Sequence, residues 1–263
     1  MGIDLGTTNS CIYLWNPDTQ DAEVILNLDG DRTCPSWVAY GRSGADEEIF
    51  VGKTANGKKN WCYDVKRIIG KSWVSLTTNS KGKKDRKLFR ELQRMLPYTI
   101  TKSDDGMVDV NCFNFNEQTD FHKDREQHHN IKYKPEQLSA EVLGFVKKAA
   151  EARCQRPVTE AVITVPAYFE NPQKEATKEA ASLAGFNVIR NLAEPIAAAV
   201  AGGFHKTKDP EEEKNVLVFD FGGGTFDVSV LHIEENVLDV EATKGDSRLG
   251  GRDIDEVILQ KCI

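Results

Sequence analysis

Two glycine-rich turns of the same design lie near opposite ends of this chain. Residues 3–8 read IDLGTT and residues 219–225 read FDFGGGT, so in each a β-like run containing Asp leads into glycine and threonine. Glycine lets the backbone approach a ligand closely, so successive N–H groups can form an anion-binding nest, and threonine hydroxyls add donors. Two such hairpins facing each other would hold a polyphosphate between them.

The aspartates beside these nests point to a bound metal ion. Asp4 and Asp220 would repel a phosphate in a partly dry cleft. A bridging Mg²⁺ removes the conflict, because carboxylate and phosphate oxygens are both hard oxygen ligands. A tight β-hairpin with an acidic turn is the alternative for either turn alone. The pair, with Asp227 after the second turn, favours a nucleotide with a divalent metal.

Composition limits the other classes of protein. The chain has 263 residues, of which 40% are hydrophobic, and a chain of this size buries about 73% of its unfolded surface. It carries 34 basic and 41 acidic residues, so we expect neither nucleic acid nor a membrane as its partner. Asp4 interrupts any apolar leader, and no apolar run reaches the ~20 residues of a membrane span. This predicts a cytoplasmic protein, with an organelle left open if a leader was removed.

The cysteines and histidines show no metal-binding spacing. We expect all six cysteines to be free thiols in a reducing compartment, because they are scattered and never form a C-x-x-C pair. His122, His128 and His129 lie in a polar stretch without visible acidic or thiolate partners, which predicts a solvated loop. The six cysteines are Cys11, Cys34, Cys62, Cys112, Cys154 and Cys262.

Hydrophobic periodicity and turn residues predict a mixed α/β chain. Strands are expected at residues 2–5, 10–15, 24–28, 36–40, 108–115, 161–165, 188–189, 216–219, 226–231 and 237–242, and helices at 53–66, 84–96, 135–149, 171–185, 195–203 and from the residue after Gly251 onward. The mixed signals of residues 36–134 indicate an inserted α+β subdomain. The last helix has no capping signal before Ile263, so we expect the chain to stop inside an element.

Four segments carry longer and more specific patterns. They are residues 2–11 (GIDLGTTNSC), 165–169 (VPAYF), 191–195 (NLAEP) and 220–227 (DFGGGTFD). These segments resemble the signatures of the seventy-kilodalton heat-shock chaperone family of the DnaK type. Shorter matches at 32–36, 66–70 and 249–251 keep the order of the family, so the resemblance spans the whole chain.

The resemblance implies an α/β, actin-like (ribonuclease H-like) ATPase fold, with lobe I carrying the inserted α+β subdomain and with the beginning of lobe II. The nucleotide would lie at the base of the cleft between the lobes. The implied division is lobe IA at residues 1–35 and 135–207, subdomain IB at 36–134, the start of lobe IIA at 208–249 and a truncated start of lobe IIB at 250–263. The rest of the family's adenosine pocket and its substrate-binding domain would follow later.

The resemblance also assigns site residues. Asp4, Glu194 and Asp220 would hold Mg²⁺ through its water shell. Thr225 would touch the γ-phosphate, and Asp227 would help to bind a monovalent cation such as K⁺. These five residues are the implied catalytic set, and the phosphates of ATP or ADP would bind two loops, made of Gly6, Thr7, Thr8 and Asn9 and of Gly222, Gly223, Gly224 and Thr225.

Family likeness extends to regulation and partners. Pro166 and Tyr168 match the family's hinge switch, which relays nucleotide state toward the interdomain linker. Arg190 matches a surface position used by J-domain co-chaperones. The resemblance further implies nucleotide-exchange factors as partners, a monomer, and a role in protein folding and the stress response.

The chain departs from the family at a lysine. The family places an essential lysine a few residues after a Val-Gly pair, and here that position is Asn56. The segment 53–64 is also shorter than the family's, so Lys53, Lys58 or Lys59 could be shifted into the cleft. If no residue substitutes, the loss of one charged donor would cost about 2.7–4 kcal/mol, or a rate loss of about 10²–10³.

Two further departures concern charge and length. Arg252 replaces an acidic residue that the family usually carries before Asp253, near the adenosine side. Residues 74–134 are longer and more polar than the family's equivalent block. We expect their basic run at 81–87 to belong to a solvated insertion rather than to a partner-binding patch.

Three functions compete at this point. The first is an ATPase domain of a chaperone, in which hydrolysis of Mg-ATP drives client binding and release. The alternative is a divergent relative with weak or no hydrolysis, acting as a regulatory or co-chaperone binding module, and Asn56 separates these two. The third is a sugar kinase of the same superfold, which the segments 165–169 and 220–227 disfavour.

Overall fold

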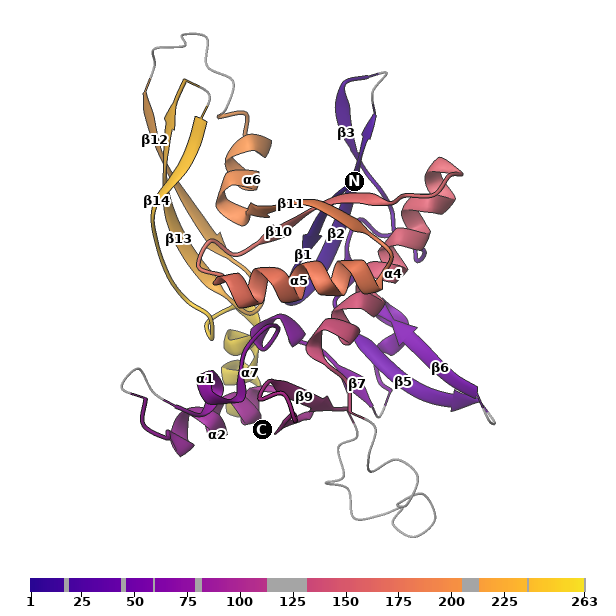
Figure 1. Cartoon of the computed structure of the whole chain (residues 1–263), viewed down its shortest axis with the longest axis vertical. Helices are drawn as coiled ribbons and strands as arrows, with labels where there is room; N and C mark the ends of the chain where they lie inside the picture. Colours follow the sequence, from indigo (N-terminus) through magenta and orange to yellow (C-terminus); the bar gives the residue numbers. More distant parts are fainter. Residues whose placement is uncertain are drawn as a thin grey trace.

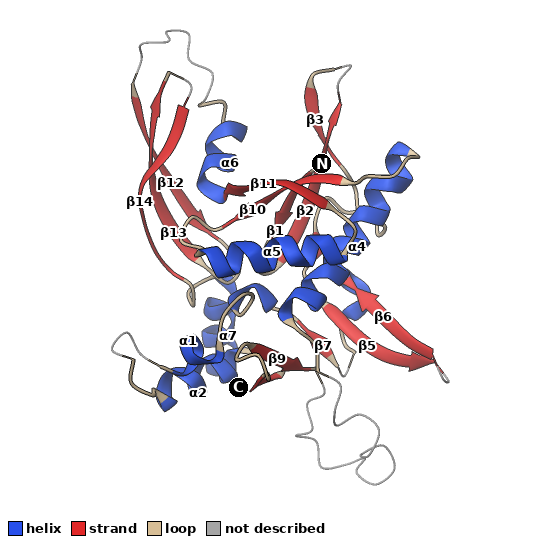
Figure 2. Cartoon of the chain, viewed as in Figure 1, coloured by secondary structure: helices blue, strands red, loops and turns tan. Residues whose placement is uncertain are grey.

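The computed structural model describes residues 1–16, 19–43, 46–58, 60–78, 82–112, 132–204, 213–235 and 237–262. Figure 1 shows the course of the chain, and Figure 2 shows how its helices lie beside several separate sheets. The largest sheet has six strands in the order β11-β10-β1-β2-β3, with β4 paired to β2. Its strands are β1 (Gly2–Leu5), β2 (Asn9–Asn16), β3 (Asp21–Val24), β4 (Cys34–Pro35), β10 (Glu160–Val165) and β11 (Asn187–Ala193).

Strand direction in this sheet determines where functional groups can gather. β1 runs parallel to β10 and β10 runs parallel to β11, whereas β1 and β2 form an antiparallel hairpin. The carboxyl ends of parallel strands lie at the same edge of a sheet. Gly6, Pro166 and Glu194, which directly follow these three strands, are therefore brought to one edge.

Two long helices cover the sheet and confirm the predicted apolar stripe. Helix α4 (Pro135–Cys154) packs against β2 and against α5 (Asn171–Leu183), which in turn contacts β11. Leu138, Val142 and Val146 of α4 are buried at helical spacing. On α5 the buried residues include three alanines, Ala176, Ala180 and Ala181, and small residues let the two helices approach closely.

The second sheet is the predicted β meander near the end of the chain. It consists of β12 (Lys214–Phe221), β13 (Phe226–Glu234) and β14 (Val237–Asp246), all antiparallel. Helix α6 (Glu194–Ala201) contacts both this sheet and β11, and so lies between the two sheets (Figure 1). Helix α7 (Gly251–Cys262) follows β14, and its apolar residues Ile254, Val257 and Ile258 are exposed.

The block at residues 36–134 contains two small sheets, one of order β6-β5-β7 and one of β8 and β9. A helix predicted at 53–66 is wrong, because positive φ angles at Gly57 and Asp64 interrupt any continuous helix and leave two 3₁₀ turns around a short strand. The elements are β5 (Val38–Ser43), β6 (Asp46–Val51), η1 (Gly52–Ala55), β7 (Trp61–Cys62), η2 (Val65–Arg67), α1 (Trp73–Thr77), α2 (Arg86–Met95), β8 (Thr99–Lys102) and β9 (Val108–Asn111).

The strand predicted at 24–28 is also wrong in its position, since β3 ends at Val24. Asn27 turns the chain there with its side chain. Its Oδ1 accepts hydrogen bonds from the backbone N–H groups of Asp29 and Asp31, and its Nδ2 donates to the Thr33 carbonyl. A side chain that bonds nearby backbone groups in this way competes with a strand ladder.

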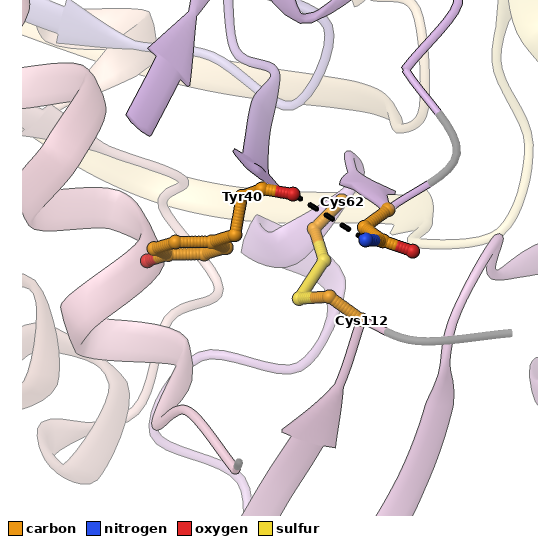
Figure 3. Close-up of a disulfide and its surroundings, with 4 residues drawn as sticks. Tyr40, Cys62 and Cys112 are labelled. Carbon is orange, nitrogen blue, oxygen red and sulfur yellow. Dashed lines mark hydrogen bonds between the residues drawn. A yellow bond between two sulfur atoms is a disulfide. The ribbon is translucent and has the colours of Figure 1, made fainter. Parts of the chain in front are cut away.

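A disulfide joins Cys62 of β7 to Cys112, the residue after β9, so the expectation of six free thiols is wrong for this pair (Figure 3). Their Cα atoms lie 5.9 Å apart, within the usual range for a disulfide, and both residues are buried. A separation of 50 residues with no motif gave the sequence no signal for the pairing. The free cysteines of the described chain are Cys11, Cys34, Cys154 and Cys262.

The basic run and the histidine-rich stretch of this block are described only in part. Lys87 of the basic run is exposed, as expected, and lies 3.8 Å from Glu91 on the same helix. His122, His128 and His129 fall outside the described residues. Within the described chain, no helix is long and apolar enough to span a membrane.

The disulfide gives a first prediction. Alkylation of the unreduced, denatured protein should modify four cysteines, and reduction should raise the number to six by mass spectrometry. Replacing Cys62 and Cys112 by Ser should lower the free energy of unfolding by about 2–4 kcal/mol, because the crosslink no longer restricts the unfolded chain. Cys262→Ser, at an exposed position, is the control and should leave it unchanged. Six alkylated cysteines without reduction would contradict the pairing.

Candidate functional site

The two glycine-rich turns are in contact. The first follows β1 and the second joins β12 to β13. A Cβ atom placed on Gly223 would overlap Thr8 Oγ1, and one on Gly224 would lie 2.6 Å from Thr7 Cγ2. The structure thus brings together two segments from opposite ends of the chain, and only glycine fits at the point of contact.

The start of helix α7 holds the second turn in place. The N–H of Gly251 donates to the Gly222 carbonyl at 3.0 Å, and the N–H of Arg252 donates to the Gly223 carbonyl at 2.9 Å. In a trans peptide the N–H points opposite to the C=O. The N–H groups of the next residues, Gly223 and Gly224, therefore point away from α7, as an anion-binding nest requires.

Four carboxylates from different strands share this region: Asp4 of β1, Glu194 at the start of α6, Asp220 of β12 and Asp227 of β13. Asp4 accepts a hydrogen bond from Thr164 Oγ1 at 3.0 Å, and Asp220 faces Asp227 across the hairpin. Partial burial, followed by the charge of Asp4, raises the pKa of Asp220. The sheet edge therefore gathers the acidic residues predicted from the sequence.

Burial is the main influence on Glu194 and Asp227, and neighbouring carboxylates add to it. Burial, with the charges of Asp4 and Asp220 adding to it, raises the pKa of Glu194. Burial, with the charges of Glu194 and Asp220, raises the pKa of Asp227 to about 6. Such a cluster favours the binding of a cation, because a positive charge relieves the repulsion.

A lysine that the sequence analysis gave no role lies in this cluster. Lys66 of η2 places its Nζ 2.6 Å from Glu194 Oε1, and the two side chains are only 10% and 16% exposed. Its charge opposes the rise in pKa at Glu194, Asp220 and Asp227. The one available signal was its place in the family-like segment 66–70, which does not distinguish it from its neighbours.

Two atoms of the site lack partners among the described residues. Thr8 Oγ1 and Asp227 Oδ1 are buried without a hydrogen bond, whereas buried polar atoms are normally paired. Thr8 Oγ1 packs against Gly223 and Asp227 Oδ1 packs against Gly245 of β14, and both are hard oxygen atoms of the kind that Mg²⁺ and its water shell prefer. Within the described part of the chain, no three His, Cys, Asp or Glu side chains are grouped to hold a metal directly.

The remaining predicted residues lie around this core. The N–H of Gly222 donates a hydrogen bond to the carbonyl of Thr225, which closes the second turn. Asn9 is exposed at the start of β2. Pro166 is buried, whereas Arg190 lies exposed on β11. The structure therefore separates Arg190 from the carboxylates by several residues of the strand.

Tyr168 links the site to a second hollow. Burial raises the pKa of its hydroxyl, and the charges of Asp227 and Glu194 act in the same direction. The residue also lines a cavity of about 560 Å³ together with Lys71, which follows η2, and Thr243 of β14. Tyr168 is thus placed where a change near the carboxylates could reach both sheets.

Comparison with known proteins supports the geometry. The model of the family described as Hsp70 protein matches residues 1–263. The chain belongs to the Hsp70 family. Its fold is accordingly the actin-like ATPase fold, in agreement with the mixed α/β architecture and the paired loops. This confirms the family and fold that the sequence motifs predicted.

Two curated relatives of this Hsp70 chain illustrate the match. It is 38% identical to the "Heat shock cognate HSP70 protein" of Trypanosoma brucei brucei over 268 residues, which cover 100% of this chain and 35% of the relative. It is 40% identical to the "Chaperone protein dnaK3" of Thermosynechococcus vestitus over 264 residues, covering 98% of this chain and 34% of the relative. The chain thus spans about a third of the length of these relatives.

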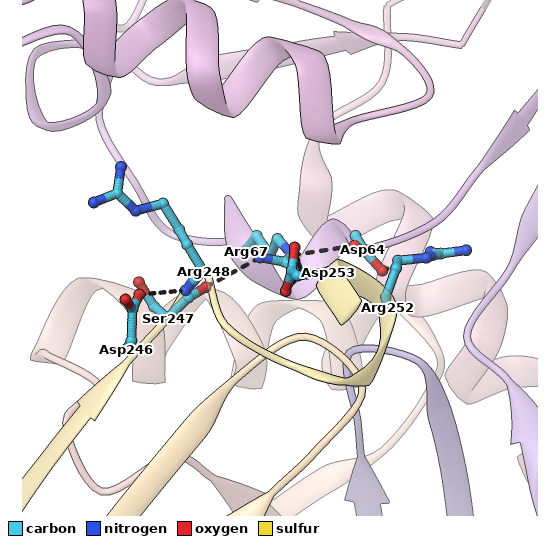
Figure 4. A network of polar contacts seen from close by, with 7 residues as sticks. All are labelled: Asp64, Arg67, Asp246, Ser247, Arg248, Arg252 and Asp253. Carbon is cyan, nitrogen blue, oxygen red and sulfur yellow. Dashed lines mark hydrogen bonds and ion pairs between the residues drawn. The ribbon is translucent and has the colours of Figure 1, made fainter. Parts of the chain in front are cut away.

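Arg252, which stands at a position that is usually acidic in the family, pairs with a buried carboxylate in this Hsp70 chain (Figure 4). Arg252 Nη1 lies 2.9 Å from Oδ1 of Asp64, a carboxylate that is 1% exposed, and its guanidinium stacks on the Tyr63 ring at 3.8 Å. Asp64 also forms an ion pair with Arg67, and Nη2 of Arg67 lies 3.2 Å from Oδ2 of Asp253 in α7. The network joins η2 to α7, so Arg252 contributes to the contact between the two lobes.

The residues considered as substitutes for the family lysine lie elsewhere. Asn56 is exposed at the end of η1, Lys53 pairs with Asp31 at 2.6 Å, and Lys58 lies over the Phe50 ring. The suggestion that Lys53 or Lys58 enters the cleft is therefore wrong. The short segment holds them at its outer side, and Lys59 falls outside the described residues.

Arg252→Glu should destabilise the contact between the lobes. It removes an ion pair and places a second negative charge beside buried Asp64, so the free energy of unfolding should fall by about 1.5–3 kcal/mol. Arg252→Lys should lose less, because it keeps the charge but not the stacking. Chemical denaturation would measure both, with Lys261→Glu on the same helix as an exposed control. Equal effects of Arg252→Glu and Lys261→Glu would show that the network contributes nothing.

The raised pKa of Asp227 predicts that the stability of the protein without ligands depends on pH. A carboxyl group with a raised pKa binds its proton more tightly in the folded state, so stability falls as pH rises from about 4 through about 6. Asp227→Asn should therefore raise the unfolding temperature at about pH 7.5 more than at about pH 4.5. Asp239→Asn, on exposed β14, is the control. An equal gain at both pH values would refute this electrostatic explanation.

Proposed function

We propose that this chain forms the phosphate and metal side of the Mg-ATP site of an Hsp70 ATPase domain, and that ATP hydrolysis there drives client binding and release. The observation that carries the proposal is the contact of Gly223 with Thr8 beside the four carboxylates. Family membership supports it. A polyphosphate is bound by backbone N–H donors and a metal ion. The chain brings such donors to one place with carboxylates that can hold the water shell of a metal ion.

Each predicted residue has a part in this proposal. Thr7, Thr8 and the N–H groups of Gly223 and Gly224 would bind phosphate oxygens. Asp4, Glu194 and Asp220 would hold water molecules of the Mg²⁺ shell, and the ion would neutralise phosphate charge. Asp227, with its unpartnered Oδ1, would take part in a K⁺ site. The backbone of the remaining loop residues would shape the two turns; these residues are Gly6, Asn9, Gly222 and Thr225.

Catalytic strength is a separate question, and here the exposed Asn56 supports a second candidate. With neither Lys53 nor Lys58 in the cleft, a charged donor at the family's position is lost. The chain would then bind nucleotide but hydrolyse it slowly and act as a regulatory partner. Single-turnover hydrolysis distinguishes the two: a rate about 10²–10³ below that of an Hsp70 with the lysine favours the regulator, and an equal rate favours the ATPase.

Partners are proposed on family likeness. J-domain co-chaperones would contact the surface that includes Arg190, which is exposed on β11. Nucleotide-exchange factors would act on the cleft between the lobes, and the chain would work as a monomer. A change in the site would reach these surfaces through Pro166 and Tyr168, the latter lying between the carboxylates and the 560 Å³ cavity.

Calorimetry with Mg-ATP and with Mg-tripolyphosphate tests the proposed site. The wild-type chain should bind both, because the residues described here address the phosphates. Gly223→Ala should raise the Kd at least about tenfold, since the new Cβ overlaps Thr8 and separates the loops. Gly144→Ala, in open space on helix α4, is the matched control and should bind as the wild type. Absence of binding by the wild type to either probe would refute the proposal.

A further inference from the structure

Lys66 occupies the position from which a cation can reach both a phosphate loop and the carboxylates. It lies on the 3₁₀ turn η2, directly before Arg67, whose buried ion pairs with Asp64 and Asp253 fix the turn. The Lys66 side chain is therefore carried on a rigid element. Its Nζ is bonded to Glu194, which follows β11 at the edge of the sheet where the site lies.

The first phosphate loop is the neighbour of Lys66 on its other side. A small cavity of about 20 Å³ is lined by Gly6, Thr7 and Lys66 together. A void of this size admits about one water molecule. The lysine thus borders the loop that is proposed to bind phosphate, and apolar side chains such as Val38 and Leu138 close the void on its other sides.

Among the described residues, one carboxylate bonds to the buried ammonium group of Lys66, which leaves it donors to spare. An ammonium group carries three N–H donors, and one of them is used by Glu194 at 2.6 Å. Lys66 also opposes the repulsion among Glu194, Asp220 and Asp227. It can therefore offset the negative charge of the cluster and still present N–H groups to a second anion.

We propose that the ammonium group of Lys66 is the cation that binds phosphate in the cleft of this chain. It would replace the family lysine, whose position is occupied by Asn56. This inference rests on the proposed function. In the chain without ligands Lys66 is held ready by Glu194, and a bound polyphosphate shares or takes over the ammonium group. Lysine suits this role because its compact charge on a flexible stem can turn between two partners. The lysines of the shortened segment, Lys53 and Lys58, take no part.

Binding of Mg-tripolyphosphate tests this assignment without any need for hydrolysis. Lys66→Gln should raise the Kd at least about tenfold, and Lys66→Arg should restore part of the affinity because it keeps the charge. Lys53→Gln and Lys58→Gln are the matched controls and should bind as the wild type. Calorimetry gives the Kd, and the rise in unfolding temperature on adding the probe gives an independent measure.

A double variant separates phosphate binding from a purely structural role, in which Lys66 only neutralises Glu194. In the Glu194→Gln background the ion-pair partner of Lys66 is neutral, so a lysine that served only to neutralise Glu194 would have no further effect on binding. If Lys66 binds phosphate, the added Lys66→Gln should still weaken binding at least about tenfold. Equal affinity of the double and the Glu194→Gln variants would overturn the assignment, as would weaker binding by Lys53→Gln or Lys58→Gln. Wild-type protein that binds neither Mg-ATP nor Mg-tripolyphosphate would overturn the proposed function and this assignment together.

Discussion

The two larger sheets of this molecule meet at a cluster of carboxylates, and burial is the main reason that the pKa values of Glu194, Asp220 and Asp227 are raised. The parallel strands β1, β10 and β11 bring Asp4 and Glu194 to one edge of the main sheet, and the β12–β13 hairpin adds Asp220 and Asp227. Acidic groups so close to one another destabilise a fold unless cations offset them. The chain provides a buried lysine for part of this charge, and a bound Mg²⁺ would offset the rest.

Buried arginine joins the 3₁₀ turn η2 to helix α7. Arg67 connects Asp64, Ser247 and Asp253, and Arg252 adds a second ion pair to Asp64. Breaking one partner of a buried network leaves the other charge unpaired, which costs several kcal/mol. The contact is therefore specific in its geometry, and it holds α7 against the loop that α7 supports.

The sequence predicted those parts of the structure that repeat with a regular period. The apolar stripe of α4, the β-branched run of β10 and the meander from β12 to β14 were all placed correctly, because local pattern and burial agree there. It failed where one side chain decides the conformation, as at Asn27 and Asp64, and where contacts join distant residues. Neither the Cys62–Cys112 disulfide nor the pairing of Lys66 with Glu194 leaves a periodic trace.

The contact between Thr8 and Gly223 has a consequence for how the protein folds. These residues belong to the first and last thirds of the chain, so their contact closes a loop that spans most of the chain. Contacts between distant residues form late, because closing a long loop costs entropy that few early interactions offset. The proposed site would therefore be complete only once the second hairpin is in place, and nucleotide would then bind only molecules whose two sheets have docked.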